Sequence, residues 1–163
     1  MKTVHSLILV FLLSAATTLQ AELPTKKVLT LGLAKRLVAA AEAEAKKRGA
    51  TVVIAVVDDG GQLIFLERLD DTQVASVEVA IGKARTAAIF RRPSKVFEDQ
   101  VKNGRVAALA LPGATPLQGG IPITIEGKVI GAIGASGNSP QEDEEIALAG
   151  AAVTASAVQE ESR

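Results

Sequence analysis

The stretch VASVEVAIGKARTAAIF, residues 74–90, decides the fold, because it predicts one long helix that is covered on two sides. The apolar residues of one face recur at helical spacing: Val74, Val77, Ile81, Ala84 and Ala88. The opposite face repeats at the same spacing but mixes an ammonium and a hydroxyl with apolar bulk: Val79, Lys83, Thr86 and Phe90. A helix that is apolar nearly all round is normally buried on both sides. We therefore expect one face to lie on the sheet of its own domain and the other to meet a second subunit, a ligand, or both.

Turn and cap signals divide the rest of the chain into two β-hairpins and three further helices. One helix is expected between the N-cap Thr30 and the C-cap Gly49, and the last is expected to start with Ser139 as N-cap and Pro140 at its first position. The other expected elements are strands 51–57 and 62–69, a short helix 94–103 capped by Ser94, and strands 121–125 and 129–136. An acidic or hydroxyl N-cap for the central helix is expected among residues 70–72. This order predicts an α+β fold in which an antiparallel sheet of two hairpins is sandwiched by helices.

The first 21 residues predict a secretory signal peptide, with cleavage after Ala21. Lys2 gives the short basic start, and Leu7 to Leu13 form an apolar run that is too short to span a bilayer comfortably as an uncleaved anchor. The remaining residues, 22–163, are expected to form a single domain. We expect that domain to be periplasmic or extracellular.

The composition of residues 22–163 excludes several classes of site. The only histidine is His5 and the only methionine is Met1, and the chain has no Cys, Trp or Tyr. Residues 22–163 therefore cannot build the usual zinc, copper or iron–sulfur sites, or a catalytic triad that needs histidine. With 17 basic against 18 acidic residues, they also offer no electrostatic reason to bind nucleic acid.

Five blocks of sequence, in order, carry a resemblance to a known family. They are VVDDGG (56–61), RLDD (68–71), KARTAA (83–88), LQGGIPI (117–123) and IGASG (133–137). The chain resembles the GlcG/HbpS-like haem-binding proteins, which include the C-terminal domain of PduO-type proteins, over about residues 28–158. The resemblance implies a profilin- or roadblock-like sandwich, a homo-oligomer of two to eight subunits, and haem or a related tetrapyrrole as ligand. In some relatives a histidine near the first helix binds the iron, and this chain has none there; the threonine implicated at the haem in extracellular relatives matches Thr86.

The candidate cofactor-binding residues are Arg68, Lys83, Arg85, Thr86 and Phe90. The cations and the hydroxyl suit an anionic ligand edge, such as haem propionates or a small carboxylate, and Phe90 suits an apolar wall. The alternative is that Lys83 and Arg85 form structural ion pairs with Asp70, Asp71 or Glu78. Because no imidazole or thiolate is available, the iron would have weak oxygen ligation or a lysine amine, which predicts modest haem affinity.

Two further functions stay open at this point. One is an accessory factor or enzyme acting on a small hydroxy- or oxo-acid, with Asp58, Arg68, Lys83 and Arg85 as its charged site. The other is an interaction module in which the central helix is buried in a homo-oligomer.

Two motifs also have alternative readings. Asp58 and Asp59 suit either a general base or cation site, or hydrogen bonding within the turn. Gln118-Gly119-Gly120 suits either an anion cradle or close packing of the backbone, and it lacks the Lys-Ser/Thr of a phosphate loop. The sequence identifies no catalytic residue and no protein-bound metal site.

Overall fold

The computed structural model describes residues 23–155, so the expected signal peptide lies outside the described residues. The elements are α1 (Leu31–Arg48), β1 (Val53–Asp58), β2 (Leu63–Arg68), α2 (Ser76–Phe90), α3 (Lys95–Lys102), the 3₁₀ helix η1 (Val106–Ala110), β3 (Gly120–Ile125), β4 (Lys128–Ser136) and α4 (Pro140–Ala151). The order of helices and hairpins is the one that the sequence predicted, with η1 in place of an undefined apolar segment. Among the described residues, no helix has the length and apolar character that a membrane crossing requires.

The four strands form one antiparallel sheet in the order β2-β1-β4-β3. Each hairpin pairs its own two strands, and β1 joins the hairpins by pairing with β4. Val56, for example, lies between Phe65 of β2 and Ile133 of β4. Because β1 is central and covered on both faces, its sequence is an almost unbroken run of β-branched apolar residues.

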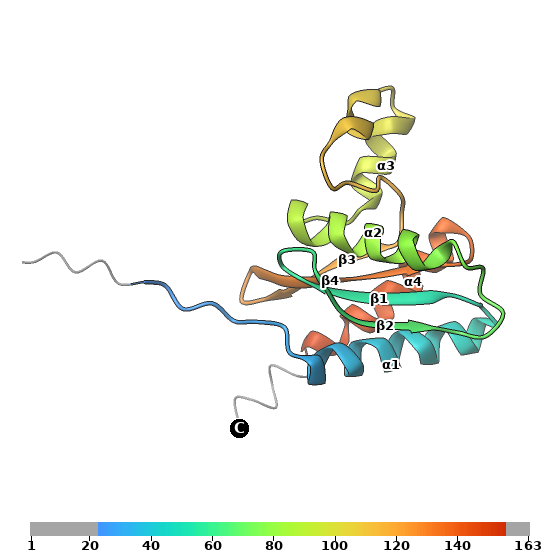
Figure 1. The fold of residues 1–163 in the computed structure, drawn as a ribbon, viewed down its shortest axis with the longest axis horizontal. Helices are drawn as coiled ribbons and strands as arrows, with labels where there is room; N and C mark the ends of the chain where they lie inside the picture. The colour runs from blue at the N-terminus through green and yellow to red at the C-terminus, as the bar shows by residue number, and fades with distance from the viewer. Residues whose placement is uncertain (1–22, 156–163) are drawn as a thin grey trace, which may run out of the picture.

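The two faces of the sheet carry different helices: α1 and α4 cover one, and α2 covers the other (Figure 1). Alternate residues of β1 serve the two sides, so Ile54 and Val56, with Val52 just before the strand, join the core beneath α1 and α4. The α2 side is built from small residues, and a Cβ at Gly134 would lie 2.7 Å from the backbone nitrogen of Ala84. The helix therefore lies close to the sheet and is held there by shape as much as by apolar area.

The expected inner face of α2 is confirmed except at one residue. Ala84 and Ala88 are buried against the sheet, and Val77 and Ile81 pack at the edge of the same layer. Val74 was wrongly included, because the helix begins at Ser76 and Val74 is 72% exposed in the preceding turn.

Some predicted caps are present and others are replaced by tertiary contacts. Thr30 caps α1, Gly49 ends it with positive φ, and Ser139 forms a capping box at α4. The cap prediction for α2 was wrong, because α2 starts after Ala75 with no side-chain cap. Ser94 does stand at the N-cap position of α3, but its hydroxyl makes no cap hydrogen bond. Residues 70–72 instead close the turn after β2, where the Thr72 hydroxyl donates to the Leu69 carbonyl.

Candidate functional site

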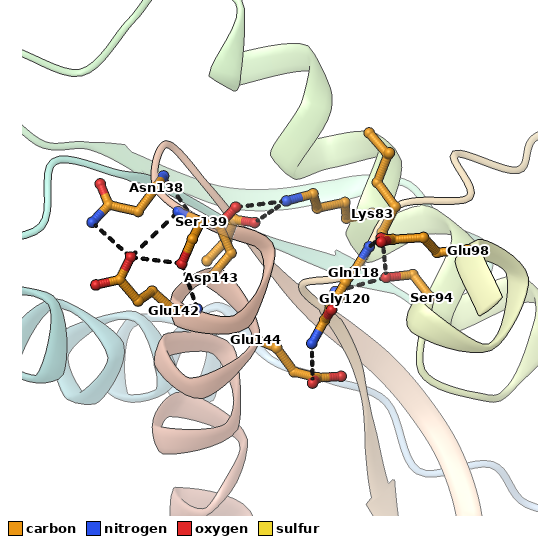
Figure 2. Close-up of polar contacts among 12 residues, drawn as sticks. Lys83, Ser94, Glu98, Gln118, Gly120, Asn138, Ser139, Glu142, Asp143 and Glu144 are labelled. Atoms are coloured by element: carbon orange, nitrogen blue, oxygen red, sulfur yellow. Dashed lines mark hydrogen bonds and ion pairs between the residues drawn. The ribbon is translucent and has the colours of Figure 1, made fainter. Parts of the chain in front are cut away.

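Lys83, the first candidate, lies on the side of α2 that faces away from solvent and is only 4% exposed. Its ammonium donates to Asp143 Oδ2 at 2.8 Å and to the Ala135 carbonyl at 3.0 Å (Figure 2). Asp143 stands in the first turn of α4, and Ala135 is near the end of β4. Lys83 therefore ties α2 to two other elements through a buried ion pair, and its partner is none of the acidic residues expected from the sequence.

Asp143 is as deeply buried as its partner, with 2% exposure. Burial raises the pKa of its carboxyl group, whereas the Lys83 ammonium and the backbone amides of Asn138 and Gly137 act in the opposite direction. The Asn138 amide donates to Asp143 Oδ1 at 3.0 Å. Since both charges of the pair are out of water, removing either one leaves the other without compensation.

The polar face of α2 is covered by residues 111–119, which connect η1 to β3 and which we name the cover loop. The Ser94 hydroxyl donates to the Leu117 carbonyl at 2.5 Å and accepts from the Gly120 amide at 2.8 Å (Figure 2). The Gln118 backbone amide donates to the Glu98 carboxylate, and the Gln118 side-chain amide donates to Glu144 Oε2 at 2.6 Å. The loop is thus fastened to both α3 and α4.

Glu98 holds the cover loop, and the pKa of its carboxyl group depends on its partners. Burial acts to raise the pKa of its carboxyl group, but hydrogen bonds from the Lys102 ammonium and the Gln118 amide outweigh it and lower that pKa overall. The ionised form of Glu98 is therefore the one that holds the cover loop.

Thr86 has no exposed surface, because the cover loop lies directly on it. Its hydroxyl donates to the Gly82 carbonyl at 2.8 Å and accepts from the Thr115 amide at 2.6 Å. Gly82 leaves the space that the Thr115 side chain fills. The Thr86 hydroxyl therefore already has both a donor and an acceptor partner within the chain.

The Gln118-Gly119-Gly120 segment packs closely, as the simpler of its two readings predicted. A Cβ at Gly119 would lie 2.8 Å from the Ala135 carbonyl oxygen and 3.0 Å from Lys83 Nζ. A Cβ at Gly120 would overlap the Lys83 carbonyl. The glycines let the loop approach α2 backbone to backbone.

The other charged candidates each form a separate hydrogen bond with the backbone. Arg85 Nε donates to the Gly61 carbonyl at 3.1 Å. The Arg68 guanidinium, which is exposed, donates through Nη2 to the Thr72 carbonyl at 2.7 Å. Asp58 accepts from the Gln62 amide at 2.8 Å, which is the hydrogen bonding within the turn that the sequence favoured. Each candidate of the hydroxy- or oxo-acid hypothesis therefore has a different partner.

Phe90, at the end of α2, packs against Phe97 of α3 with ring centroids 4.8 Å apart and an interplanar angle of 55°. Phe97 is buried and Phe90 is half-buried, so this pair docks α3 on α2 while leaving one ring partly open. In Figure 1, α3 projects from the body of the domain above α2. Within the described range, no three side chains of His, Cys, Asp or Glu gather as a metal site would require.

Comparison with known proteins gives consistent matches over this fold. A family model described as "Haem degrading protein HbpS-like" matches residues 29–152. Protein GlcG of Escherichia coli (strain K12) is 44% identical over 112 residues, which cover 69% of this chain and 84% of that protein.

Two crystal structures extend the comparison to three dimensions. The structure of HbpS is 35% identical with a TM-score of 0.75, covering 81% of this chain and 94% of that chain. The structure of a PduOC:heme complex is 27% identical with a TM-score of 0.71, covering 77% and 94%. The chain therefore belongs to the HbpS-like family that its five sequence blocks resembled.

Proposed function

We propose that this protein binds haem or a related tetrapyrrole, as a carrier, buffer or redox sensor. The observation that carries the proposal is membership of the HbpS-like family, supported by the likeness to a chain solved with haem. Two features give no support to nucleic-acid binding as an alternative. They are the near-neutral charge and, in residues 23–155, the absence of aromatic clusters beyond the Phe90–Phe97 pair.

The donor set of the chain suits a weakly held haem. Residues 22–163 contain no His, Cys, Met or Tyr, so the iron is left with hydroxyl, carboxylate or lysine ligands. Cations for the propionates are plentiful, but Lys83 already holds Asp143. Thr86 can reach a ligand only if the cover loop moves first, and Lys83 only if its ammonium leaves Asp143 of α4 and the Ala135 carbonyl of β4.

We place the macrocycle at the partly open end of α2, beside Phe90, with Arg85 near its propionate edge. Both side chains keep some exposure, unlike Lys83 and Thr86. Arg68 lies on the edge strand β2, where it is exposed, and is the fifth candidate for an anionic group.

A haemin titration of the purified protein, followed by Soret absorbance, tests the proposal. We expect a saturable shift at micromolar protein and easy loss of haem to a competing apo-protein, since strong axial ligands are absent. The placement beside Phe90 predicts the same Soret shift in Thr86→Val and Thr86→Ser at a temperature where both variants are folded; a weaker shift in Thr86→Val alone would move the iron to Thr86. The absence of any saturable shift in the wild type would contradict haem binding.

A homo-oligomer is part of the same proposal, with the outer side of α2 as one contact. Val79 is half-buried on that side and lies outside the apolar layer against the sheet. Val79→Glu is expected to lower the mass measured by light scattering. An unchanged mass would exclude Val79 from the interface.

We also propose export of the protein, on the basis of its first 21 residues. Expression of the full chain followed by intact mass analysis of the exported fraction is expected to give a product that begins at Glu22. A product that retains residues 1–21 would contradict cleavage.

A second candidate function is the binding of a small carboxylic acid. It is favoured by a cationic cleft at one end of the sheet, whose lining includes Asp59 but none of the residues that the sequence proposed for this function.

A further inference from the structure

A cleft of about 760 Å³ opens at the end of the sheet where both hairpin turns lie. Its walls come from the segment before α1 (Thr25 to Lys27), Asp59 of the β1–β2 turn, Arg91 just after α2, and residues 124–130 around the β3–β4 turn. Figure 1 shows these turns and the chain leading into α1 at the same end of the sheet. The volume is within the usual range for small-molecule sites. We name it the sheet-end cleft.

The sheet-end cleft carries more positive than negative charge. Lys26 pairs with Asp59 at 2.5 Å and Lys27 pairs with Glu126 at 2.8 Å, which balances two of its four cations. Among the described residues, the side chains of Arg91 and Lys128 make no hydrogen bond or ion pair, although Lys128 adds to the stronger effect of Lys27 in lowering the pKa of the Glu126 carboxyl group. An excess of two positive charges therefore faces one cleft.

Arg91 adopts a strained backbone conformation at the edge of this cleft. It ends α2 with φ 55° and ψ 38°, a left-handed conformation that disfavours residues with a Cβ. Gly49 ends α1 with nearly the same angles, φ 65° and ψ 26°, and the same pair of cap hydrogen bonds. The same cap thus uses the favoured residue in one helix and an arginine in the other. Backbone strain of this kind concentrates at functional sites.

We propose that the sheet-end cleft binds an organic ligand through its carboxylates, with Arg91 and Lys128 as the main contacts. A guanidinium matches a carboxylate with two parallel hydrogen bonds, and the ammonium supplies a second point of charge. Two sources carry this chemistry. One is the pair of propionates on haem, in which case the inference rests on the proposed function and Arg91 and Lys128, in place of Arg85, hold the propionate edge; the other is a free di- or tricarboxylic acid.

The experiment combines three probes with matched variants. Haemin, haemin dimethyl ester and citrate are titrated by absorbance or calorimetry into the wild type, Arg91→Gly, Lys128→Gln and Lys47→Gln. Lys47 is an exposed lysine of α1 outside the cleft and controls for general charge. We expect Arg91→Gly and Lys128→Gln each to weaken the binding of haemin or citrate about tenfold, and Lys47→Gln to leave both affinities unchanged. The dimethyl ester should bind the wild type and Arg91→Gly equally well.

The outcomes separate the cleft from haem binding. If citrate binds and depends on Arg91 while haemin does not bind, the cleft stands and the proposed function fails. If haemin binds equally well to the wild type and Arg91→Gly, and citrate does not bind, the cleft inference is overturned and haem binding stands. Equal losses in Lys47→Gln also overturn it. Because glycine relieves the strain, Arg91→Gly is expected to raise the melting temperature by a few degrees, so weaker binding there is not a folding defect.

Discussion

The body of α2 and its C-terminal end place two cations in opposite situations. Lys83, in the body of the helix, is buried and bonded to Asp143 and the Ala135 carbonyl. Arg91, eight residues later, is exposed in a strained backbone conformation and lines a cleft with excess positive charge. Lys83 therefore stabilises the fold, whereas Arg91 costs stability and is available to a ligand.

Charge alone does not mark a binding site in this domain. A buried cation needs its partner at all times, since an unpaired charge in the interior is expensive. A solvated cation with no partner costs little and can bind a carboxylate when one arrives. The presence or absence of a tertiary partner distinguishes the buried cation from the solvated one. Four variants test this difference.

Lys83→Met is expected to have the largest effect. It keeps the aliphatic stem but leaves Asp143 buried without its cation, which predicts a loss of about 3–5 kcal/mol in the free energy of unfolding. Urea denaturation measures the loss. The double variant Lys83→Met/Asp143→Asn is expected to regain at least half of it, because no buried charge remains. Equal stability of the single and double variants would show that the pair is not coupled.

Gly134→Ala sharpens the contrast between helix and cleft by testing how closely α2 lies on the sheet. The new Cβ would meet the Ala84 backbone nitrogen at 2.7 Å, and the backbone of both elements would have to shift. We expect a loss of about 3 kcal/mol, the upper end for overpacking, by thermal or urea unfolding. Gly60→Ala is the control: its φ is not in the left-handed region and the nearest atom would be Asp58 Oδ1 at 3.3 Å, so its loss should stay within about 0.5 kcal/mol. Similar losses in both variants would contradict the close contact.

Thr86→Val removes the hydroxyl that accepts from the Thr115 amide and leaves that amide without its partner. The expected loss is about 1–3 kcal/mol, while Thr86→Ser keeps the hydrogen bond and should lose less. Hydrogen exchange of the Thr115 amide is a direct readout and is expected to accelerate only in the valine variant. Unchanged exchange there would mean that Thr86 does not hold the cover loop.

Glu98→Gln gives the smallest effect and a pH signature. The folded-state pKa of Glu98 lies below its ordinary value of 4.5, so its carboxylate contributes stability above that pH, and the contribution is lost as pH falls through the lower folded pKa. The wild type should exceed the variant by about 1 kcal/mol at pH 7, and the difference should shrink below pH 4.5. Urea unfolding at several pH values measures it. A difference that grows on acidification would contradict the assigned direction.

Most of the fold followed from local sequence signals. The periodicity of residues 74–90, the caps Thr30, Gly49 and Ser139, and the glycine turns predicted the elements and their order. Those signals act over a few residues, and that is why they are readable. Ser94 stands at the predicted cap position, but its hydroxyl accepts from the Gly120 amide 26 residues away instead of capping α3, a contact that local patterns do not encode.

The candidate site was predicted only in part for the same reason. The sequence singled out Lys83 and Thr86 as polar groups on an apolar helix, and both do lie on its second polar side. Their partners were missed: Asp143 is 60 residues from Lys83, and no local pattern links the two. No signal in the sequence pointed to Arg91 beyond a charged helix end, since its left-handed backbone is visible only in the structure.

One measurement tests most directly whether the two cations play opposite parts: parallel urea unfolding of the wild type, Lys83→Met and Arg91→Gly. The structure predicts shifts of opposite sign, with a loss of about 3–5 kcal/mol for Lys83→Met and a gain of about 0.5–1 kcal/mol for Arg91→Gly. Shifts of the same sign, or a loss below about 1 kcal/mol for Lys83→Met, would contradict the division between a structural cation in α2 and a ligand-facing cation at its end.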